Sequence, residues 1–354
     1  MRHAAGLFAL SLSAAAATAL ALADTPKSPP PPQAGKDPAA LTERTALLAP
    51  IQVESLTLTP IVATPAAIAG AADEPLLVLD EAMAAKQVKI REVADGTVNS
   101  LTFVNTASQP VFVMAGEVII GGKQDRIIGR NTVIPANTIQ EVPVFCVEHG
   151  RWTGESKEFT TAKALGHGRL RGQASYAAQQ DVWNEVAAKN KARKTETASG
   201  TYRKVAQQQS DGTLAAMEHQ VDAALARIPA ADRARMVGYA VALNGSVATV
   251  DVFGSPQLFK KLETKLVRSY LTEAVDIAVR KDARPPTPAD VKTFMADADK
   301  AAEKKSYDTA AAETLVNSGE HASKAKVGYK SRKPAATNAP AAATPAVYEN
   351  YQAK

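Results

Sequence analysis

Residues 111–152 hold the densest set of side chains that could do chemistry. Charged and polar groups are interspersed there with strand-like apolar runs and glycine pairs. The arginines and the lysine of this segment could offer their N–H groups to an anion. The candidate ligand-binding residues are Glu117, Lys123, Gln124, Arg126, Glu148, Arg151 and Trp152. The alternative interpretation is a set of cross-strand ion pairs on a solvated face, each stabilising the fold by about 1 kcal/mol or less.

Three residues of this segment are candidates for catalysis. Glu117 or Glu148 could act as the general base of a hydrolase. Cys146 could act as a nucleophile beside His149, which would require an accessible thiol with a lowered pKa. Cys146 stands, however, in the apolar run Val-Phe-Cys-Val, which is typical of a packed core cysteine. The pattern favours the packed cysteine and leaves the nucleophile as an alternative.

Standard catalytic and phosphate-binding motifs are absent from the sequence. It has no phosphate loop ending in Gly-Lys-Ser/Thr, no His-Glu-x-x-His and no Gly-x-Ser-x-Gly. A zinc site built on Cys146, Glu148 and His149 would need further ligands, for which His167 and His219 are conceivable. We therefore predict no metal site and no cofactor.

The Gly121-Gly122 pair is expected to position this segment as a β-hairpin. Two glycines suit a two-residue loop because both loop positions can take a positive φ. Such a loop would place Glu117 directly opposite Arg126, with Gln124 on the same face. The strand at 138–148 becomes continuously apolar toward its end, as a strand does when it enters a core.

The order of residues in this segment resembles one known family. The resemblance is carried by Gly116-Glu117, by Gly-Lys-Gln-Asp-Arg at 122–126, by Cys146-Val147-Glu148, by Gly150-Arg151-Trp152 and by the later segment 239–274. The family is the ARG and rhodanese-phosphatase-superfamily associated protein domain, named for neighbours such as ADP-ribosylglycohydrolases, and the resemblance covers residues 45–330. It implies, by association, a link to nucleotides or ADP-ribose.

Strand-like patterns come first along the chain, and helical patterns follow. Strands are predicted at 51–59, 76–79, 88–93, within 100–119 and at 138–148, and a hairpin at 236–253 around Asn244-Gly245. Helices are predicted at 181–193, 213–228, 256–280 and 288–305, the last two beginning with Ser-Pro and Thr-Pro. The pattern predicts an α+β fold, a β-sandwich-like or barrel-like sheet assembly packed by several α-helices.

The two ends of the chain differ in composition from the rest. Residues 1–23 have a short basic lead, an apolar run and a small-x-small cleavage signal, which predict a signal peptide cut after Ala23. An uncleaved anchor is the alternative. Residues 24–45 are predicted to form a Pro-rich linker, 46–332 a single α+β domain and 333–354 a disordered Ala/Pro tail. The mature protein is expected to be periplasmic or secreted and to lack a transmembrane segment.

The composition limits the classes of function. The formal net charge is +5, but residues 324–333 alone carry five basic groups and no acidic one, as expected of a basic tail. The rest of the chain is therefore nearly neutral, and a nucleic-acid partner is not predicted. Apolar residues make up 45% of the chain, which is enough for a substantial core, and its single cysteine excludes an intramolecular disulfide.

These observations favour an exported domain that binds a small anionic ligand. Two alternatives stay open, a hydrolase with a glutamate base or the cysteine nucleophile, and a structural protein that interacts with the cell envelope. The sequence does not identify a protein partner.

Overall fold

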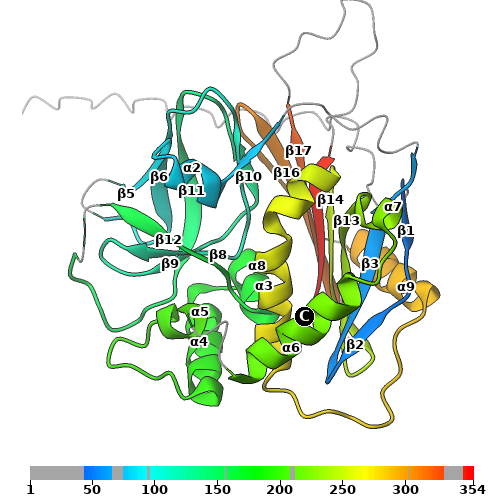
Figure 1. The fold of residues 1–354 in the computed structure, drawn as a ribbon. Helices are drawn as coiled ribbons and strands as arrows, with labels where there is room; N and C mark the ends of the chain where they lie inside the picture. The colour runs from blue at the N-terminus through cyan, green and yellow to red at the C-terminus, as the bar shows by residue number, and fades with distance from the viewer. Residues whose placement is uncertain are drawn as a thin grey trace, which may run out of the picture. The chain divides into compact units, whose positions relative to one another are not determined.

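The computed structural model describes residues 44–65, 75–93, 96–154, 156, 158–207, 212–301, 303–330 and 346–354. Residues 37–354 form one compact unit. The predicted signal peptide (1–23) and nearly all of the predicted linker (24–45) lie outside the described residues. The fold is α+β, as predicted, with eighteen strands in three sheets and eight helices among the described residues (Figure 1).

The first sheet has six antiparallel strands and curls into a half-barrel. Its strand order is β12-β8-β9-β11-β6-β5. Its strands are β5 (Val88–Glu92), β6 (Ser100–Asn105), β8 (Glu117–Gly121), β9 (Arg126–Ile128), β11 (Thr138–Cys146) and β12 (Phe159–Leu165). Burial alternates along β6, so Leu101 and Phe103 point into the core while their neighbours do not. The curl brings the edge strands together, because Arg91 bridges Glu158.

The largest sheet has nine strands, all antiparallel. The strand order is β1-β3-β13-β14-β18-β17-β16-β15, with β2 also paired to β3. Its strands are β1 (Thr45–Leu47), β2 (Ile51–Val53), β3 (Leu56–Ala63), β13 (Met236–Leu243), β14 (Ser246–Phe253), β15 (Glu303–Asp308), β16 (Ala312–Ser318), β17 (Ala322–Tyr329) and β18 (Ala346–Ala353). The Asn244-Gly245 hairpin is confirmed, since Leu243 pairs with Ser246.

The single strand predicted at 51–59 is instead a tight hairpin. Strand β2 turns at Glu54-Ser55 into β3, which continues through Pro60 to Ala63 and is buried along its whole length. Glu54 has a φ of 52° and so takes the left-handed conformation that the turn requires. The alternating apolar and polar residues at 51–59 therefore belong to two strands. The second of them, β3, is buried on both faces.

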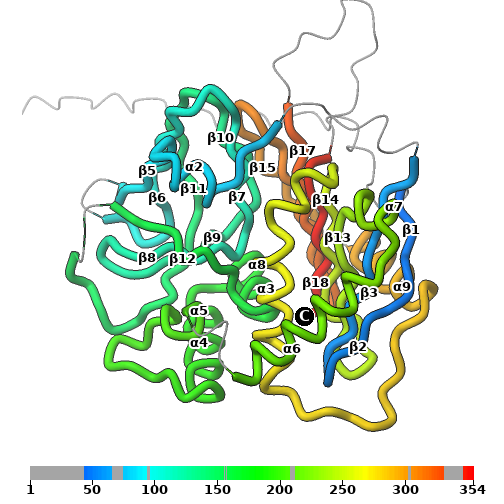
Figure 2. Tube along the Cα trace, viewed as in Figure 1, coloured from blue at the N-terminus to red at the C-terminus, as the bar shows by residue number. Residues whose placement is uncertain are grey.

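The end of the chain is not a disordered tail over its whole length. Residues Ala346–Ala353 form β18, which pairs with β14 on one side and with β17 on the other (Figure 2). The prediction for 333–354 is therefore wrong for these residues, while 333–345 lie outside the described residues. The segment Val-Tyr-Glu-Asn-Tyr-Gln has no strict alternation of apolar and polar residues, and both of its faces are buried in the sheet.

The predicted basic tail is also wrong for most of its length. Residues 324–329 belong to β17, every residue of which is buried. Lys324 and Lys326 project from one face of this strand, and both lie near the buried carboxylate of Glu349 on β18. These basic residues are therefore part of the sheet, because a carboxylate on the neighbouring strand offsets their charge.

Helices cover both faces of the nine-stranded sheet. The helices are α2 (Leu79–Ala84), α3 (Gly168–Tyr176), α4 (Gln179–Arg193), α5 (Arg203–Gln207), α6 (Gly212–Leu225), α7 (Ala230–Arg233), α8 (Pro256–Ala274) and α9 (Pro288–Asp299). Apolar side chains of α6 and α8 pack on one face, and those of α9 on the other. The predicted helix starts are confirmed, since Ser255 and Thr287 cap α8 and α9. Both helices end earlier than expected.

Helix α8 lies between the two large sheets (Figure 1), and three of its charged residues, Glu263, Lys265 and Glu273, are buried along with its apolar ones. Glu263 accepts hydrogen bonds from Arg233 and Tyr239, and Lys265 pairs with Glu117 on β8. Each buried charge of this helix thus has a partner from another element, as the cost of desolvation requires.

A buried carboxylate joins α3 and α8 to the nine-stranded sheet. Asp251 on β14 accepts two hydrogen bonds from Arg171 of α3, at 3.2 and 2.8 Å, and others from Tyr270 of α8 and Tyr348 of β18. Burial alone would raise the pKa of Asp251, but Arg171 outweighs it and holds that pKa below its usual value. The network is a structural connection between elements that are far apart in sequence.

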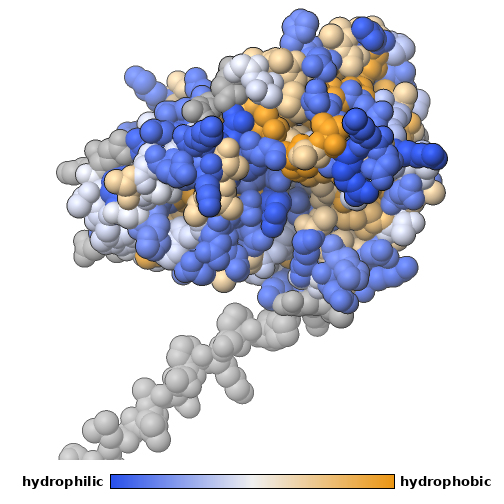
Figure 3. Space-filling view, turned by 90° about the horizontal axis from the view of Figure 1, so that it is seen from below, coloured by the Kyte–Doolittle hydropathy of each residue, from blue (hydrophilic) through white to orange (hydrophobic). Residues whose placement is uncertain are grey.

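A small sheet of β4 (Leu77–Val78), β7 (Val111–Val113) and β10 (Thr132–Ile134) completes the fold. Its strands contribute to the cores of both larger sheets. Hydrophilic residues predominate on the face seen from below, and hydrophobic ones gather there in a band (Figure 3). No helix within the described ranges is long and apolar enough to cross a membrane.

Candidate functional site

The connection between β8 and β9 is longer than a two-residue hairpin loop. Ile119 pairs with Arg126 and Val118 with Ile127, so the predicted register, with Glu117 opposite Arg126, is wrong by two residues. Both Gly121 and Gly122 do have a positive φ, at 124° and 54°. The register differs because residues 122–125 form a loop whose polar groups bond to distant parts of the chain.

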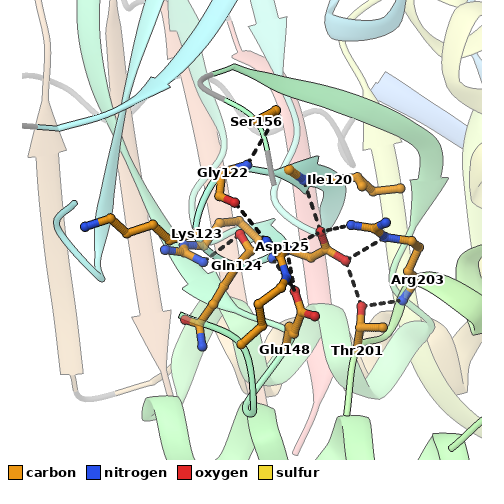
Figure 4. A network of polar contacts seen from close by, with 12 residues as sticks. Ile120, Gly122, Lys123, Gln124, Asp125, Glu148, Ser156, Thr201 and Arg203 are labelled. Atoms are coloured by element: carbon orange, nitrogen blue, oxygen red, sulfur yellow. Dashed lines mark hydrogen bonds and ion pairs between the residues drawn. The ribbon is translucent and has the colours of Figure 1, made fainter. Parts of the chain in front are cut away.

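Asp125 is the residue that holds this loop in place. Its side chain is fully buried and accepts hydrogen bonds from the Gly121 amide at 3.0 Å and the Thr201 hydroxyl at 2.7 Å. Arg203 donates two further bonds, from Nε at 3.0 Å and from Nη2 at 2.8 Å (Figure 4). The carboxylate thus joins the β8–β9 loop to the segment that begins α5.

Glu148 and Arg151 form a second pair against the same loop. Glu148 Oε2 accepts from the Asp125 amide at 3.1 Å and from Arg151 Nη2 at 2.6 Å. Arg151 Nη1 also donates to the Gly122 carbonyl at 2.8 Å. Burial raises the pKa of Glu148, but the hydrogen bonds from Arg151, Ser199 and the Asp125 amide together hold it below its usual value. Glu148 is therefore a poor general base.

Arg126 lies beside this network with its guanidinium fully buried. Its Nη1 donates to the Gln124 carbonyl at 2.7 Å. Its Nε and Nη2 have no hydrogen-bond partner within the described part of the chain, and neither has Oε2 of Glu92, which lies 3.9 Å from Nη2. The other oxygen of Glu92 accepts from the Lys123 amide at 2.9 Å, which fixes the glutamate at the loop.

Trp152 lies at the outer side of this cluster. Its ring is 6.0 Å from Arg126 Cζ and 5.4 Å from Lys123 Nζ, both within the range of a cation–π interaction. Trp152 is 48% exposed, so an indole face in contact with two cations also borders the solvent. Gln124 Nε2 is 3.4 Å from the His149 carbonyl, which holds the amide beside the same loop.

Cys146 is packed in the core, where the sequence placed it. It is fully buried at the end of β11, and Arg126 is its partner across the strands. Its backbone N–H and C=O both bond to the Gln179 side chain, at 2.8 Å each. Burial raises the pKa of the Cys146 thiol, although nearby Arg126 acts in the opposite direction. A thiol of this kind is a weak nucleophile near neutral pH.

Glu117 lies away from the other candidates. Its carboxylate receives the Lys265 ammonium at 2.5 Å and the Met114 amide at 2.9 Å, in the space between β8 and α8. Burial raises the pKa of Glu117 despite the nearby lysine. Asp80 lies 2.9 Å from the same lysine and completes a buried ionic triad. The structure therefore gives Glu117 a partner in the interior, separate from Arg126.

Of the two histidines considered as further zinc ligands, one is buried and the other is exposed. His167 is buried, with Tyr202 at 2.9 Å from Nδ1 and Glu185 at 2.8 Å from Nε2. His219 is exposed on α6. In the ranges that the structure describes, no group of three His, Cys, Asp or Glu side chains is arranged to hold a metal ion.

The structure therefore brings together six of the seven predicted ligand-binding residues and adds four others. The six are Lys123, Gln124, Arg126, Glu148, Arg151 and Trp152; the four are Glu92, Asp125, Thr201 and Arg203. Asp125 lies in segment 111–152, which is rich in charged residues, so its carboxylate could have been predicted as part of the site from the sequence. Thr201 and Arg203 lie in a polar stretch about 76 residues further on, where no local pattern points to Asp125.

Comparison with known proteins gives one match. The model of the ARG and Rhodanese-Phosphatase-superfamily-associated Protein domain matches residues 44–336, which confirms the resemblance seen in the sequence. Neither the curated proteins nor the solved structures contain a match. Because the family model covers most of its length, the chain belongs to this family.

Proposed function

We propose that this member of the family binds a small anionic ligand at the cluster around Arg126. The observation that carries the proposal is the buried guanidinium whose Nε and Nη2 have no hydrogen-bond partner among the described residues. Leaving buried donors unsatisfied costs about 1–3 kcal/mol, and more for a charged group. A ligand that accepts from these two atoms would remove that cost.

The geometry of Arg126 favours a particular kind of ligand group. Nε and Nη2 lie on one edge of the planar guanidinium, which matches two oxygens of a carboxylate or phosphate. The unsatisfied Oε2 of Glu92, 3.9 Å from Nη2, would accept from a hydroxyl or amine of the same ligand. The ligand proposed is therefore an acid with a hydrogen-bond donor close to its anionic group.

The surroundings of Arg126 support the same proposal. Asp125, Glu148 and Arg151 fix the loop through bonds to one another, so they act as the frame of the site. The half-exposed face of Trp152 suits stacking against a flat ring. The link of the family name to ADP-ribosylglycohydrolases makes ADP-ribose a reasonable first probe, since it combines a ring, hydroxyls and phosphates.

The test is ligand-induced thermal stabilisation of the wild type and of Arg126→Gln. The probes are ADP-ribose, inorganic phosphate and lactate. Arg280→Gln is the matched control, because the side chain of Arg280 is 63% exposed. We expect the stabilisation by a bound probe to be lost in Arg126→Gln and retained in the control. Circular dichroism checks that each variant is folded.

Two outcomes would count against binding at Arg126. A folded Arg126→Gln protein that responds to the bound probe as the wild type does would place the ligand elsewhere. A large fall in melting temperature for Arg126→Gln, with no response of the wild type to any probe, would favour a purely structural cluster.

We also propose that the protein is exported. The support is the pattern of residues 1–23, a short basic lead, an apolar run and the sequence Ala-Leu-Ala before Asp24. Expression in a bacterial host followed by fractionation should recover the protein outside the cytoplasm with Asp24 as its first residue. Intact mass measurement checks this, and a protein that keeps its first 23 residues would contradict cleavage.

A further inference from the structure

A concave region lies on the face of the nine-stranded sheet that carries α9. It is a pocket of about 330 Å³ between the end of α9 and strands β15, β16 and β17. It shares no residue with the cluster around Arg126. Its lining residues are Asp299, Lys304, Lys305, Ser306, Leu315, Asn317, Lys324 and Lys326. Four of these eight side chains are lysines.

The pleat of the sheet explains why three of these lysines, Lys304, Lys324 and Lys326, share one face. In the observed register, Lys304 is opposite Asn317, which is opposite Lys324. Two residues further along each strand, Ser306 is opposite Leu315, which is opposite Lys326. Residues two apart along a strand point to the same face, so both rows line the same surface. The pocket is therefore built by three adjacent strands in register.

The floor of the pocket is formed by two nearly buried lysines. The side chains of Lys324 and Lys326 are only 9% and 7% exposed. Lys324 Nζ lies 2.6 Å from Asp299 at the end of α9 and 4.8 Å from the centre of the Tyr351 ring. The carboxylate of Glu349, which is opposite Lys326 on the neighbouring strand β18, lies 3.9 Å and 3.6 Å from the Nζ atoms of Lys324 and Lys326.

The rim of the pocket differs from its floor. Lys304, Lys305 and Ser306 on β15 are exposed. Exposed lysines on an edge strand commonly prevent pairing with another chain, and β15 is such a strand. That role does not apply to Lys324 and Lys326, because β17 lies two strands inside the sheet. Lys324 and Lys326 are therefore paired with carboxylates inside the protein and also line a pocket that is open to solvent at its rim.

We propose that this pocket binds a small phosphate-bearing molecule. Lysine is a compact charge with three N–H donors, and it commonly binds phosphate as a point charge. Ser306 and Asn317 add neutral donors on the same face. A volume of about 330 Å³ lies within the range of small-molecule sites. The carboxylates of Asp299 and Glu349 hold the floor lysines in place, so the pocket is formed before the phosphate arrives.

The experiment is calorimetric titration of the full chain with inorganic pyrophosphate. The pocket variant is the double substitution Lys304→Gln with Lys305→Gln, which should fold because both side chains are exposed. Lys191→Gln, an exposed lysine on α4, is the matched control. We expect the pocket variant to weaken binding by about tenfold or more, since charge-assisted hydrogen bonds are lost. The control and Arg126→Gln should bind as the wild type does.

A substitution of a floor lysine distinguishes binding in the pocket from non-specific attraction of pyrophosphate to a positively charged surface. Lys324→Met removes the ammonium group and keeps an unbranched side chain that is one atom shorter, and circular dichroism checks that the variant is folded. We expect it to abolish saturable binding. No saturable binding of pyrophosphate by the wild type would overturn the proposal. So would unchanged affinity in the double variant, or loss of binding in Arg126→Gln alone.

Discussion

The cluster around Arg126 and the lysine pocket are both positively charged, but they are built in opposite ways. In the cluster, Asp125, Glu148 and two arginines bond at short distances across three segments of the chain. In the pocket, Lys324 and Lys326 share one sheet face with a carboxylate on the neighbouring strand, at 3.6–3.9 Å. The first arrangement leaves one particular guanidinium edge for a ligand, whereas the second offers the N–H donors of several lysines.

The difference shows how geometry sets specificity. An arginine edge recognises a planar or bidentate group, while lysines recognise charge with little demand on direction. We therefore expect the cluster to distinguish between anions of equal charge, and the pocket to distinguish mainly by charge. The following predictions test this difference between a rigid network and a set of charges on a sheet.

The largest effect is expected for Asp125→Ala. Removing this buried carboxylate leaves Arg203 and Thr201 without their partner, and breaking a buried ion pair costs about 3–5 kcal/mol. Chemical denaturation measures the loss in free energy of unfolding. Asp282→Ala, at a fully exposed carboxylate, is the control and should leave stability unchanged. An Asp125→Ala protein as stable as the wild type would mean that the network is not rigid.

A smaller effect is expected for Glu349→Gln beside the lysine pocket. The substitution leaves Lys324 and Lys326 without a buried countercharge, which should cost about 1–3 kcal/mol in the free energy of unfolding. The same change should weaken pyrophosphate binding, because the two lysines are no longer held in place. Denaturation and calorimetry on one preparation check both effects. Unchanged or tighter binding in a folded variant would contradict the role given to Glu349.

The smallest effect concerns the dependence of stability on pH. The pKa of Glu148 is held below the ordinary value of 4.5, so its contribution is fully present above that value and is lost as pH falls through the lowered pKa. In Glu148→Gln, stability should therefore fall less steeply between about pH 5 and about pH 2. Urea unfolding across this range measures the slope. An equally steep fall in the variant would assign the acid sensitivity to other carboxylates.

Features that depend on neighbouring residues were predictable from the sequence. The Asn244-Gly245 turn and the caps at Ser255 and Thr287 need only local chemistry, and all three are confirmed. The α+β class followed from the same kind of pattern. Lys123 and Trp152 were correctly placed in one segment, because the β8–β9 loop and the end of β11 are close in sequence as well as in space.

Features that depend on distant partners were not predictable. The loop register follows from Asp125 bonding to residues 76 and 78 positions away. Glu117 pairs with Lys265, 148 positions away, and no spacing rule could have shown it. Lys324 and Lys326 lie within the predicted domain, but their pairing was missed and they were counted in a basic tail, because their countercharge, Glu349, lies on a strand that composition alone did not reveal.

The position of β18 has a consequence for the way the domain folds. Residues Ala346–Ala353 fill the place between β14 and β17 and provide Tyr348 to the Asp251 network. Val250 and Tyr351, which pair there, are 101 positions apart in the sequence. Closing the nine-stranded sheet therefore requires a contact between distant parts of the chain, and contacts of this kind slow folding.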